Sequence, residues 1–282
     1  MTSYVFDHRT CFLGEGPLWH PTRKQLFWFD IVNSRLLSRV GDEALMWQLE
    51  EHHSAAGWID EETLLIASET GLWRFDIESG QRSLIVPLEA DRPETRSNDG
   101  RADRQGGFWI GTMGKKAERG EGTIYRFYKG ELVKLFDDLT IPNAICFAPD
   151  GRTAYFACTK SGKIQSQALD AEGWPEGGPE VFVDLTSEGL NPDGAIVDAK
   201  GGVWNAQWGA GRVARYLPNG AFDRAVSVAG QHSSCPAFGG EDLRTLYITT
   251  AQEGIEAPDA DQGVVYACEA GFDGVPETQV VL

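Results

Sequence analysis

Short runs of aromatic and β-branched residues recur along the chain and form its main pattern. A turn and a second run follow most of them, and in the second run apolar and polar positions alternate. Alternation with a period of two is typical of a β-strand with one buried face. The first runs are Leu26–Asp30, Leu64–Ser68, Phe108–Thr112, Ala154–Cys158, Val203–Gln207 and Leu246–Thr250.

The even spacing of these runs indicates an internal repeat. Their starts lie 38, 44, 46, 49 and 43 residues apart, and Gly, Pro or Asp occur in the turns that precede them, as tight reversals require. Six such units, with almost no helical periodicity, predict an all-β fold, a six-bladed β-propeller with four-stranded antiparallel blades. We expect a single propeller domain over residues 1–282. A β-sandwich or two small β domains are the alternative, but no linker or charge block divides the chain.

The fold predicts where a functional site can be built. In a propeller the innermost strand of each blade lines a central channel, so the residues that open these strands crowd one mouth of it. The amino-terminal residues Tyr4–Phe6 could supply the outer strand of the last blade and close the ring. Polar side chains at the strand openings would then face one another around the axis.

Composition and charge narrow the classes of function. The chain has 42 acidic and 25 basic residues, a net charge of −17, which disfavours nucleic acid and anionic membrane as partners. We find no secretory signal and no apolar run long enough to span a bilayer. Five cysteines without C-x-x-C spacing indicate neither a disulfide framework nor a thiolate zinc site. We therefore expect a cytoplasmic protein, a monomer or a weak homo-oligomer.

One position of the repeat carries candidate metal ligands. The residues five places before each turn are Glu15, Ala55, Asn98, Asn143, Asp193 and Cys235. Two carboxylates and two amides converging on one axis would be costly to bury without a counter-ion, and a divalent cation solves that problem. Oxygen ligands favour a hard ion, so we expect Ca²⁺, Mg²⁺ or Mn²⁺, with Ca²⁺ preferred and Zn²⁺ or Fe²⁺ compatible. Three protein ligands would leave positions open for water and substrate, as in a catalytic site.

Several motifs, in order from Leu13 to about Tyr266, carry a family resemblance. They are Gly14–Trp19, Arg96–Gly100, Gly111–Met113, Pro142–Asn143, Pro192–Gly194 and Phe238–Gly240. As a set they resemble the gluconolactonase, senescence marker protein and luciferin-regenerating enzyme family of six-bladed propellers. The resemblance implies hydrolysis of cyclic sugar esters at one divalent metal held by Glu15, Asn143 and Asp193. It also implies that Arg96 and Asn98 contact the substrate.

The residue types suit this chemistry. A bound metal would polarise the lactone carbonyl and stabilise the oxyanion that forms when water attacks. Asp193 could take the proton from that water as general base; Glu15 is the other candidate, and only the resemblance favours Asp193. The guanidinium fork of Arg96 and the amide of Asn98 can bind the hydroxyls of a polyol.

A glycine-bracketed loop departs from the family pattern. The family often has an acidic residue a few positions after Gly-Thr-Met, whereas here Met113 is followed by Gly114, Lys115 and Lys116. We expect the basic residues of this loop, Lys115, Lys116 and Arg119, to attract a lactone that carries an anionic group, and Lys116 to bind the substrate. A solvated loop without a role in binding is the alternative.

Three classes of function remain open. The first is a metal-dependent sugar lactonase of carbohydrate metabolism, which opens a small-molecule aldonolactone to the aldonic acid. The second is a propeller that binds calcium or a protein without catalysis, and the third is a propeller esterase acting on another lactone or ester. The chain has no G-x-S-x-G motif, so a serine mechanism is unsupported. Glu15, Asn143 and Asp193 at an open site favour an enzyme, and Arg96 with Asn98 favours a sugar.

Overall fold

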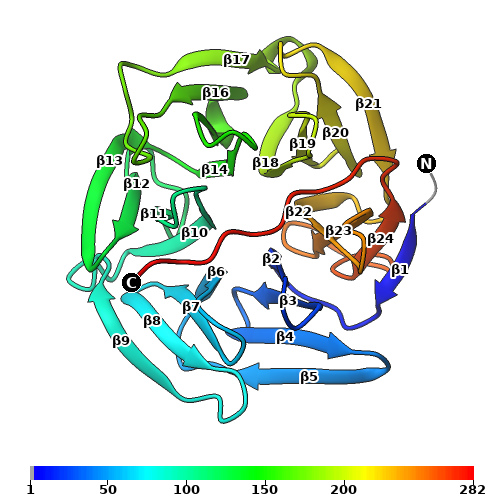
Figure 1. Ribbon diagram of the computed structural model, residues 1–282. Coiled ribbons are helices and arrows are strands. Elements are labelled where there is room, and N and C mark those ends of the chain that lie inside the picture. Colours follow the sequence, from blue (N-terminus) through cyan, green and yellow to red (C-terminus); the bar gives the residue numbers. More distant parts are fainter. Residues whose placement is uncertain (1–2) are drawn as a thin grey trace.

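A computed structural model describes residues 3–282. Six four-stranded antiparallel sheets surround a central axis like blades (Figure 1), which confirms the predicted six-bladed propeller. Two 3₁₀ helices, η1 (Thr159–Ser161) and η2 (Thr186–Glu188), are the helical elements in the described residues. None of the helices in this part of the chain is long and apolar enough to cross a membrane.

The innermost strands surround the axis and consist largely of small and polar residues. Their side chains are almost all buried, because neighbouring blades cover both faces. These strands are β2 (Gly14–His20), β6 (His53–Trp58), β10 (Thr95–Ala102), β14 (Pro142–Phe147), β18 (Asn191–Val197) and β22 (His232–Gly239).

The predicted apolar runs form the next strands outward. The first runs coincide with the second strand of each blade, and the alternating second runs coincide with third strands. The second strands are β3 (Gln25–Asp30), β7 (Thr63–Ser68), β11 (Phe108–Gly114), β15 (Thr153–Cys158), β19 (Val203–Trp208) and β23 (Thr245–Ala251). The third strands are β4 (Arg35–Val40), β8 (Gly71–Asp76), β12 (Gly122–Tyr128), β16 (Lys163–Ala168), β20 (Arg212–Tyr216) and β24 (Val265–Glu269).

The outer strands form the rim, and one of them closes the ring. They are β5 (Glu43–Gln48), β9 (Arg82–Pro87), β13 (Glu131–Leu139), β17 (Glu180–Asp184), β21 (Phe222–Ser227) and β1 (Tyr4–Asp7). The amino-terminal β1 pairs with β24, so the last blade contains both the start and the end of the strand order. The predicted closure by Tyr4–Phe6 is confirmed.

Apolar side chains fill the space between neighbouring blades. One such cluster contains Phe27 and Phe29 of the first blade and Leu64 and Phe75 of the second. Trp28, Trp109 and Trp204 of the second strands are fully buried. A hydrophobic core therefore lies between each pair of neighbouring blades. Polar groups surround the axis itself.

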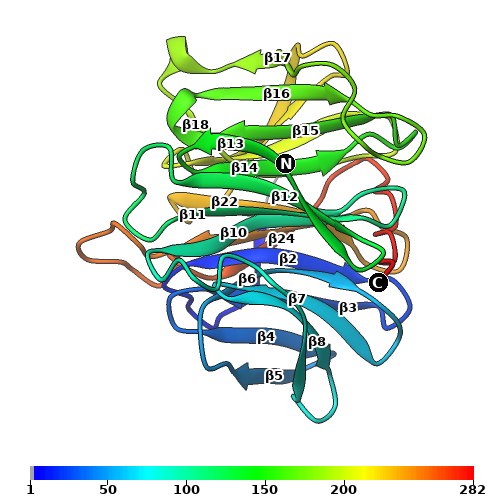
Figure 2. The ribbon, with the colours of Figure 1, turned by 90° about the vertical axis from the view of Figure 1, so that its left-hand side faces the viewer.

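The carboxyl-terminal segment crosses the ring face on the side where the inner strands end (Figure 1). Val280 N–H donates to Trp58 O and Val281 N–H to Gly106 O, each at 2.9 Å. Glu277 of this segment forms a buried ion pair with Arg101 of β10. The carboxyl-terminal end and the long loop between β23 and β24 lie on opposite sides of the ring (Figure 2). The segment therefore covers one mouth of the channel and leaves the other mouth to the loops.

Candidate active site

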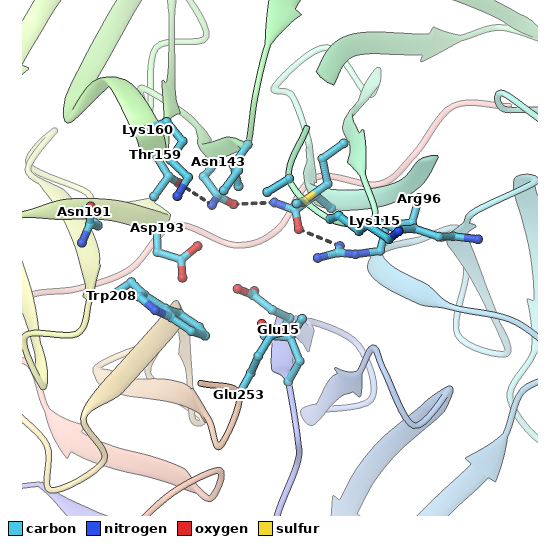
Figure 3. A pocket seen from close by; sticks show the side chains of 16 residues that line it. Glu15, Arg96, Lys115, Asn143, Thr159, Lys160, Asn191, Asp193, Trp208 and Glu253 are labelled. Carbon is cyan, nitrogen blue, oxygen red and sulfur yellow. Dashed lines mark hydrogen bonds between the residues drawn. The ribbon is translucent and has the colours of Figure 1, made fainter. Parts of the chain in front are cut away.

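A cavity of about 550 Å³ opens at the mouth opposite the carboxyl-terminal segment (Figure 3). It is surrounded by the openings of four inner strands and by the loops between second and third strands. Its lining residues are Leu13, Glu15, Arg96, Asn98, Met113, Lys115, Lys116, Ala117, Ile141, Asn143, Thr159, Lys160, Asn191, Asp193, Trp208 and Glu253.

All six residues predicted for the site line this one cavity: Glu15, Arg96, Asn98, Lys116, Asn143 and Asp193. They come from four blades and are up to 178 positions apart in the chain, from residue 15 to residue 193. Ala55 and Cys235, which share the repeat position, are buried and do not line the cavity. The repeat position therefore predicts four of the polar residues that meet at the mouth, namely Glu15, Asn98, Asn143 and Asp193.

A β-bulge in each inner strand turns these side chains toward the axis. The pairing of β2 with β3 shifts after Glu15, and that of β14 with β15 shifts after Asn143. The following residues, Gly16 and Ala144, have positive φ values of 55° and 58°. In β18 the shift falls between Pro192 and Ala195, so Asp193 lies within the bulge itself. An extra residue bends a strand and re-aims its side chains, which brings residues of slightly different register into the same cavity.

Position 16 requires glycine, because two blades approach each other closely there. A Cβ at this position would lie 2.1 Å from the carbonyl oxygen of Ser54 on the neighbouring inner strand. Glycine therefore provides both the left-handed backbone and the close approach of two blades. The carboxylate of Glu15 accepts a hydrogen bond from the Gly16 N–H at 3.0 Å, which holds the side chain over this turn.

The amide of Asn143 is fixed at both of its ends. Its Oδ1 accepts a hydrogen bond from Asn98 Nδ2 at 2.9 Å, and its Nδ2 donates to Thr159 Oγ1 at 2.9 Å. The Thr159 hydroxyl donates in turn to Pro192 O at 2.7 Å, next to Asp193. These bonds connect two predicted metal ligands, Asn143 and Asp193, through one hydroxyl group.

Arg96 lies beside this network with part of its guanidinium free. Its Nη1 donates to Asn98 Oδ1 and to Ser97 O, both at 2.8 Å. Asn98 uses both amide hydrogens within the protein, because Nδ2 also donates to Pro142 O at 2.9 Å. Asn98 therefore orients its neighbours, and toward a ligand it can only accept a further hydrogen bond at Oδ1. Arg96 can still donate its Nε and Nη2 hydrogens to a ligand.

The two carboxylates are buried close to each other (Figure 3). Desolvation, followed by repulsion from Asp99, raises the pKa of Glu15 to about 8. Desolvation, followed by repulsion from Glu15, raises the pKa of Asp193 well above its usual range. Arg96 acts in the opposite direction on both groups, but neither carboxylate forms an ion pair within residues 3–282. Such a pair of charges calls for a counter-ion.

The donor set fits a hard divalent cation. Glu15 and Asp193 offer carboxylate oxygens, and Asn143 offers an amide oxygen with a second lone pair. In the part of the chain that is described, no group of three or more His, Cys, Asp or Glu side chains is placed to hold a metal. The candidate centre therefore depends on the amide oxygen as its third ligand and leaves the cavity side open.

The structure adds residues that the repeat could not reveal. Glu253 lines the cavity from the loop between β23 and β24, where its carbonyl accepts a hydrogen bond from His232 Nδ1 at 2.8 Å. The His232 ring stacks on Trp208 with centroids 4.3 Å apart, which fixes the indole in the cavity wall. Thr159 and Lys160 follow β15 directly in η1. Thr159, Lys160 and Glu253 follow the second strands of their blades, and Trp208 ends one of these strands. The repeat position at the openings of the inner strands therefore carried no signal of these residues.

Comparison with known proteins shows which family the chain resembles over most of its length. The chain matches the SMP-30/Gluconolactonase/LRE-like region over residues 13–252. L-arabinolactonase of Azospirillum brasilense is 34% identical over 274 residues, covering 93% of this chain and 90% of that protein. 6-deoxy-6-sulfogluconolactonase of Pseudomonas putida is 32% identical over 274 residues, covering 94% of each.

A solved structure extends the likeness to three dimensions. The calcium-binding protein regucalcin from Agrobacterium tumefaciens has a TM-score of 0.96 to this chain at 39% identity, covering 99% of this chain and 97% of that one. The family match alone spans well over half of the sequence. The protein therefore belongs to the SMP-30/gluconolactonase/LRE-like family, as its ordered motifs predicted.

Proposed function

We propose that the protein hydrolyses a sugar-derived aldonolactone to the open-chain aldonic acid with the help of one divalent cation. The observation that carries the proposal is the meeting of Glu15, Asn143 and Asp193 at an open cavity. Two of the three are buried carboxylates without an ion-pair partner in the described residues. The family is one of lactone hydrolases, and the enzyme class follows from it.

A cation held by Glu15, Asn143 and Asp193 would supply Lewis acidity toward the lactone carbonyl. We favour Ca²⁺, because the donors are all oxygens and the regucalcin of Agrobacterium tumefaciens is a calcium-binding protein. Zn²⁺, Mg²⁺, Mn²⁺ and Fe²⁺ remain to be compared in the same assay. Asn98 and Thr159 hold the Asn143 amide in one orientation, so the third ligand is preorganised for its role.

The protein's own groups divide the remaining tasks. Asp193 takes the proton from the attacking water, and Glu15, the second carboxylate among the proposed ligands, is the alternative base. Arg96 offers its free Nε and Nη2 hydrogens to the hydroxyls of the substrate. Trp208 offers an aromatic surface to the C–H face of a sugar ring. Together these groups fit a compact polyol ester.

The relatives suggest two types of substrate. L-arabinolactonase is named for a neutral sugar lactone, and 6-deoxy-6-sulfogluconolactonase for one that carries a sulfonate. Lys116, predicted to bind substrate, lines the cavity and extends the proposal to a lactone with an anionic group.

The proposal is tested by acid release from a panel of aldonolactones. Chelator-treated protein is expected to hydrolyse them no faster than the spontaneous rate, and added cation is expected to restore turnover. Asp193→Asn should lower kcat at least about 100-fold, because it removes both a negatively charged ligand of the cation and the general base. Lys134→Gln, an exposed change on β13, serves as the control. A folded, cation-binding protein without turnover of any lactone would instead support the binding platform.

A further inference from the structure

The cavity differs in charge from the rest of the molecule. Four of its lining residues are basic and three are acidic, although acidic residues outnumber basic ones by 42 to 25 in the chain. The acidic residues are Glu15, Asp193 and Glu253, which lie near one another in Figure 3. A bound divalent cation would compensate Glu15 and Asp193, so the basic groups need their own explanation.

Two of the four basic side chains already have charge partners. Arg96 lies within the field of Glu253, the acidic residue that the cation would not compensate, and its Nη1 donates to Asn98 Oδ1. Lys115 Nζ lies 2.6 Å from Glu69 Oε2. His52 Nδ1 lies 3.3 Å from the same Glu69 oxygen. The charges of Arg96 and Lys115 are therefore committed within the protein.

Lys116 and Lys160 differ in this respect. Both are exposed and line the cavity, and neither forms an ion pair with any residue in the range 3–282. Glu118 of the same loop accepts a hydrogen bond from the main-chain N–H of Lys116 at 3.0 Å and forms no ion pair with its ammonium group. Two lysines from separate loops thus leave their ammonium groups available beside one cavity.

Lys160 has a defined place relative to the predicted reaction centre. It lies in η1 directly after Thr159, whose hydroxyl holds Asn143. Figure 3 shows Lys160 on the side of the cavity opposite Glu15 and Glu253. A ligand that reached from the carboxylates to this side would meet a positive charge at its far end.

We propose that Lys116 and Lys160 form an anion-binding subsite for lactones that carry a carboxylate, sulfonate or phosphate away from the lactone carbonyl. The inference rests on the proposed lactonase function and names its substrate class. Each ammonium group supplies three hydrogen-bond donors and a point charge suited to such groups. A neutral sugar would leave both lysines to water.

The test compares matched pairs of aldonolactones of one ring size and stereochemistry, which differ only in a terminal hydroxyl or a terminal anionic group. In metal-loaded wild type we expect kcat/KM to be at least about tenfold higher for the anionic partner, as charge-assisted bonds provide. Lys116→Gln and Lys160→Gln should each reduce this ratio several-fold, and the double variant should bring it close to one. Added salt should reduce it as well, because both lysines are exposed.

Lys134→Gln is the matched control, since it removes the same charge from an outer strand and should leave the ratio unchanged. Equal kcat/KM for both partners in wild type, or an unchanged ratio in the double variant, would overturn the subsite. Calorimetric binding of a polyol and of its terminal phosphate ester separates this from the function itself. Tighter binding of the phosphate ester that is lost in the double variant, with no lactone hydrolysed, would sink the proposed function and leave the subsite standing.

Discussion

At the scale of single residues, the hydroxyl of Thr159 connects two candidate metal ligands. It accepts a hydrogen bond from Asn143 Nδ2 and donates to Pro192 O, the carbonyl that precedes Asp193. A hydroxyl that both accepts and donates fixes two strands relative to each other. Without it the Asn143 amide could rotate, since only Asn98 would hold its other end. Thr159 is thus a positioning residue rather than a catalytic one.

We predict that Thr159→Val lowers the affinity for the divalent cation by about 10- to 100-fold, as is typical when a group that orients a ligand is removed. Valine keeps the shape and loses the hydrogen bonds. Cation binding is measured by calorimetry, with Thr186→Val as control because Thr186 begins η2 in the same way but is exposed and does not line the cavity. Unchanged cation affinity in Thr159→Val would show that Asn143 is not a ligand or is held without this hydroxyl.

His53 is a buried neutral group at the opening of β6. Its Nδ1 lies 2.9 Å from Glu51 O, and Arg82 Nη1 donates to its Nε2 at 3.1 Å. Nδ1 therefore carries the proton, and Nε2 must stay unprotonated to accept from a cation. Desolvation is the largest effect and, with repulsion from Arg82, lowers the pKa of His53 to about 4, although Glu51 and Glu69 act in the opposite direction.

This pKa predicts how stability depends on pH. Between the usual pKa of 6.5 and the folded value of about 4, the unfolded chain binds the proton and the folded chain does not. The free energy of unfolding is therefore unaffected by this titration above pH 6.5. It falls as the pH drops from 6.5 toward 4, by about 3 kcal/mol in all. His53→Asn retains an N–H donor and cannot titrate, so its unfolding free energy in urea should fall less between pH 7 and pH 4.5 than that of wild type. Parallel curves for both proteins would contradict the assignment.

At the scale of elements, two blades each contain a buried cluster of one Asp, one Trp and one Arg. Asp103, directly after β10, accepts hydrogen bonds from Trp109 Nε1 at 3.1 Å and from Arg126 Nε at 2.6 Å. The blade formed by β18 to β21 repeats the arrangement with Asp198, Trp204 and Arg215. In each blade one carboxylate connects the first three strands near the mouth opposite the cavity.

The two clusters should respond differently to the same change. Arg126 and Asp103 have fully buried side chains, and within residues 3–282 Arg126 forms an ion pair with Asp103 alone. Arg215, in contrast, also contacts a second carboxylate, that of Asp223, at 2.9 Å. We predict that Asp103→Asn lowers the unfolding free energy by about 3 to 5 kcal/mol, because it leaves a buried cation without a counter-charge. Asp198→Asn should cost less, since Asp223 remains. Denaturant unfolding of both variants measures the difference, and equal losses would show that Asp223 does not compensate.

The elements also explain what could be predicted from the sequence. Short aromatic and β-branched runs identified the second strands, which are buried on both faces, and alternation identified the third strands, such as Gly71–Asp76. The innermost strands carry short polar and small residues, as in His53–Trp58, since they pack on backbone around the axis, so no periodicity marked them. The candidate ligands could nevertheless be predicted, because they recur at one distance from a turn. Glu253 and Lys160 could not be predicted, because their positions depend on how loops of separate blades meet.

At the scale of the whole molecule, both chain ends hold the ring together. The carboxyl-terminal segment crosses one mouth and fits closely, since a Cβ on Gly57 would lie 2.5 Å from Val280. At the other end β1 pairs with β24, and Arg9 behind it donates to Leu45 O of the first blade at 2.7 Å. The amino terminus therefore connects the last blade to the first, and this connection keeps the site residues of β2 and β18 within one cavity.

This closure predicts a stability cost when β1 loses its anchor. Phe6 packs edge-on against Tyr247 of β23 with centroids 4.8 Å apart, and the Arg39 guanidinium lies over its ring at 5.3 Å. Phe6→Ala should lower the unfolding free energy by about 2 to 4 kcal/mol, less than a fully buried Phe would at its upper limit. Phe222→Ala on outer strand β21 is the control, because Phe222 is 56% exposed and closes nothing. If β1 detaches, the free edge of β24 can pair with another chain, so Phe6→Ala should also form dimers on gel filtration at high concentration. An unchanged unfolding midpoint and a single monodisperse species like wild type would mean that the ring is held by its blade interfaces alone.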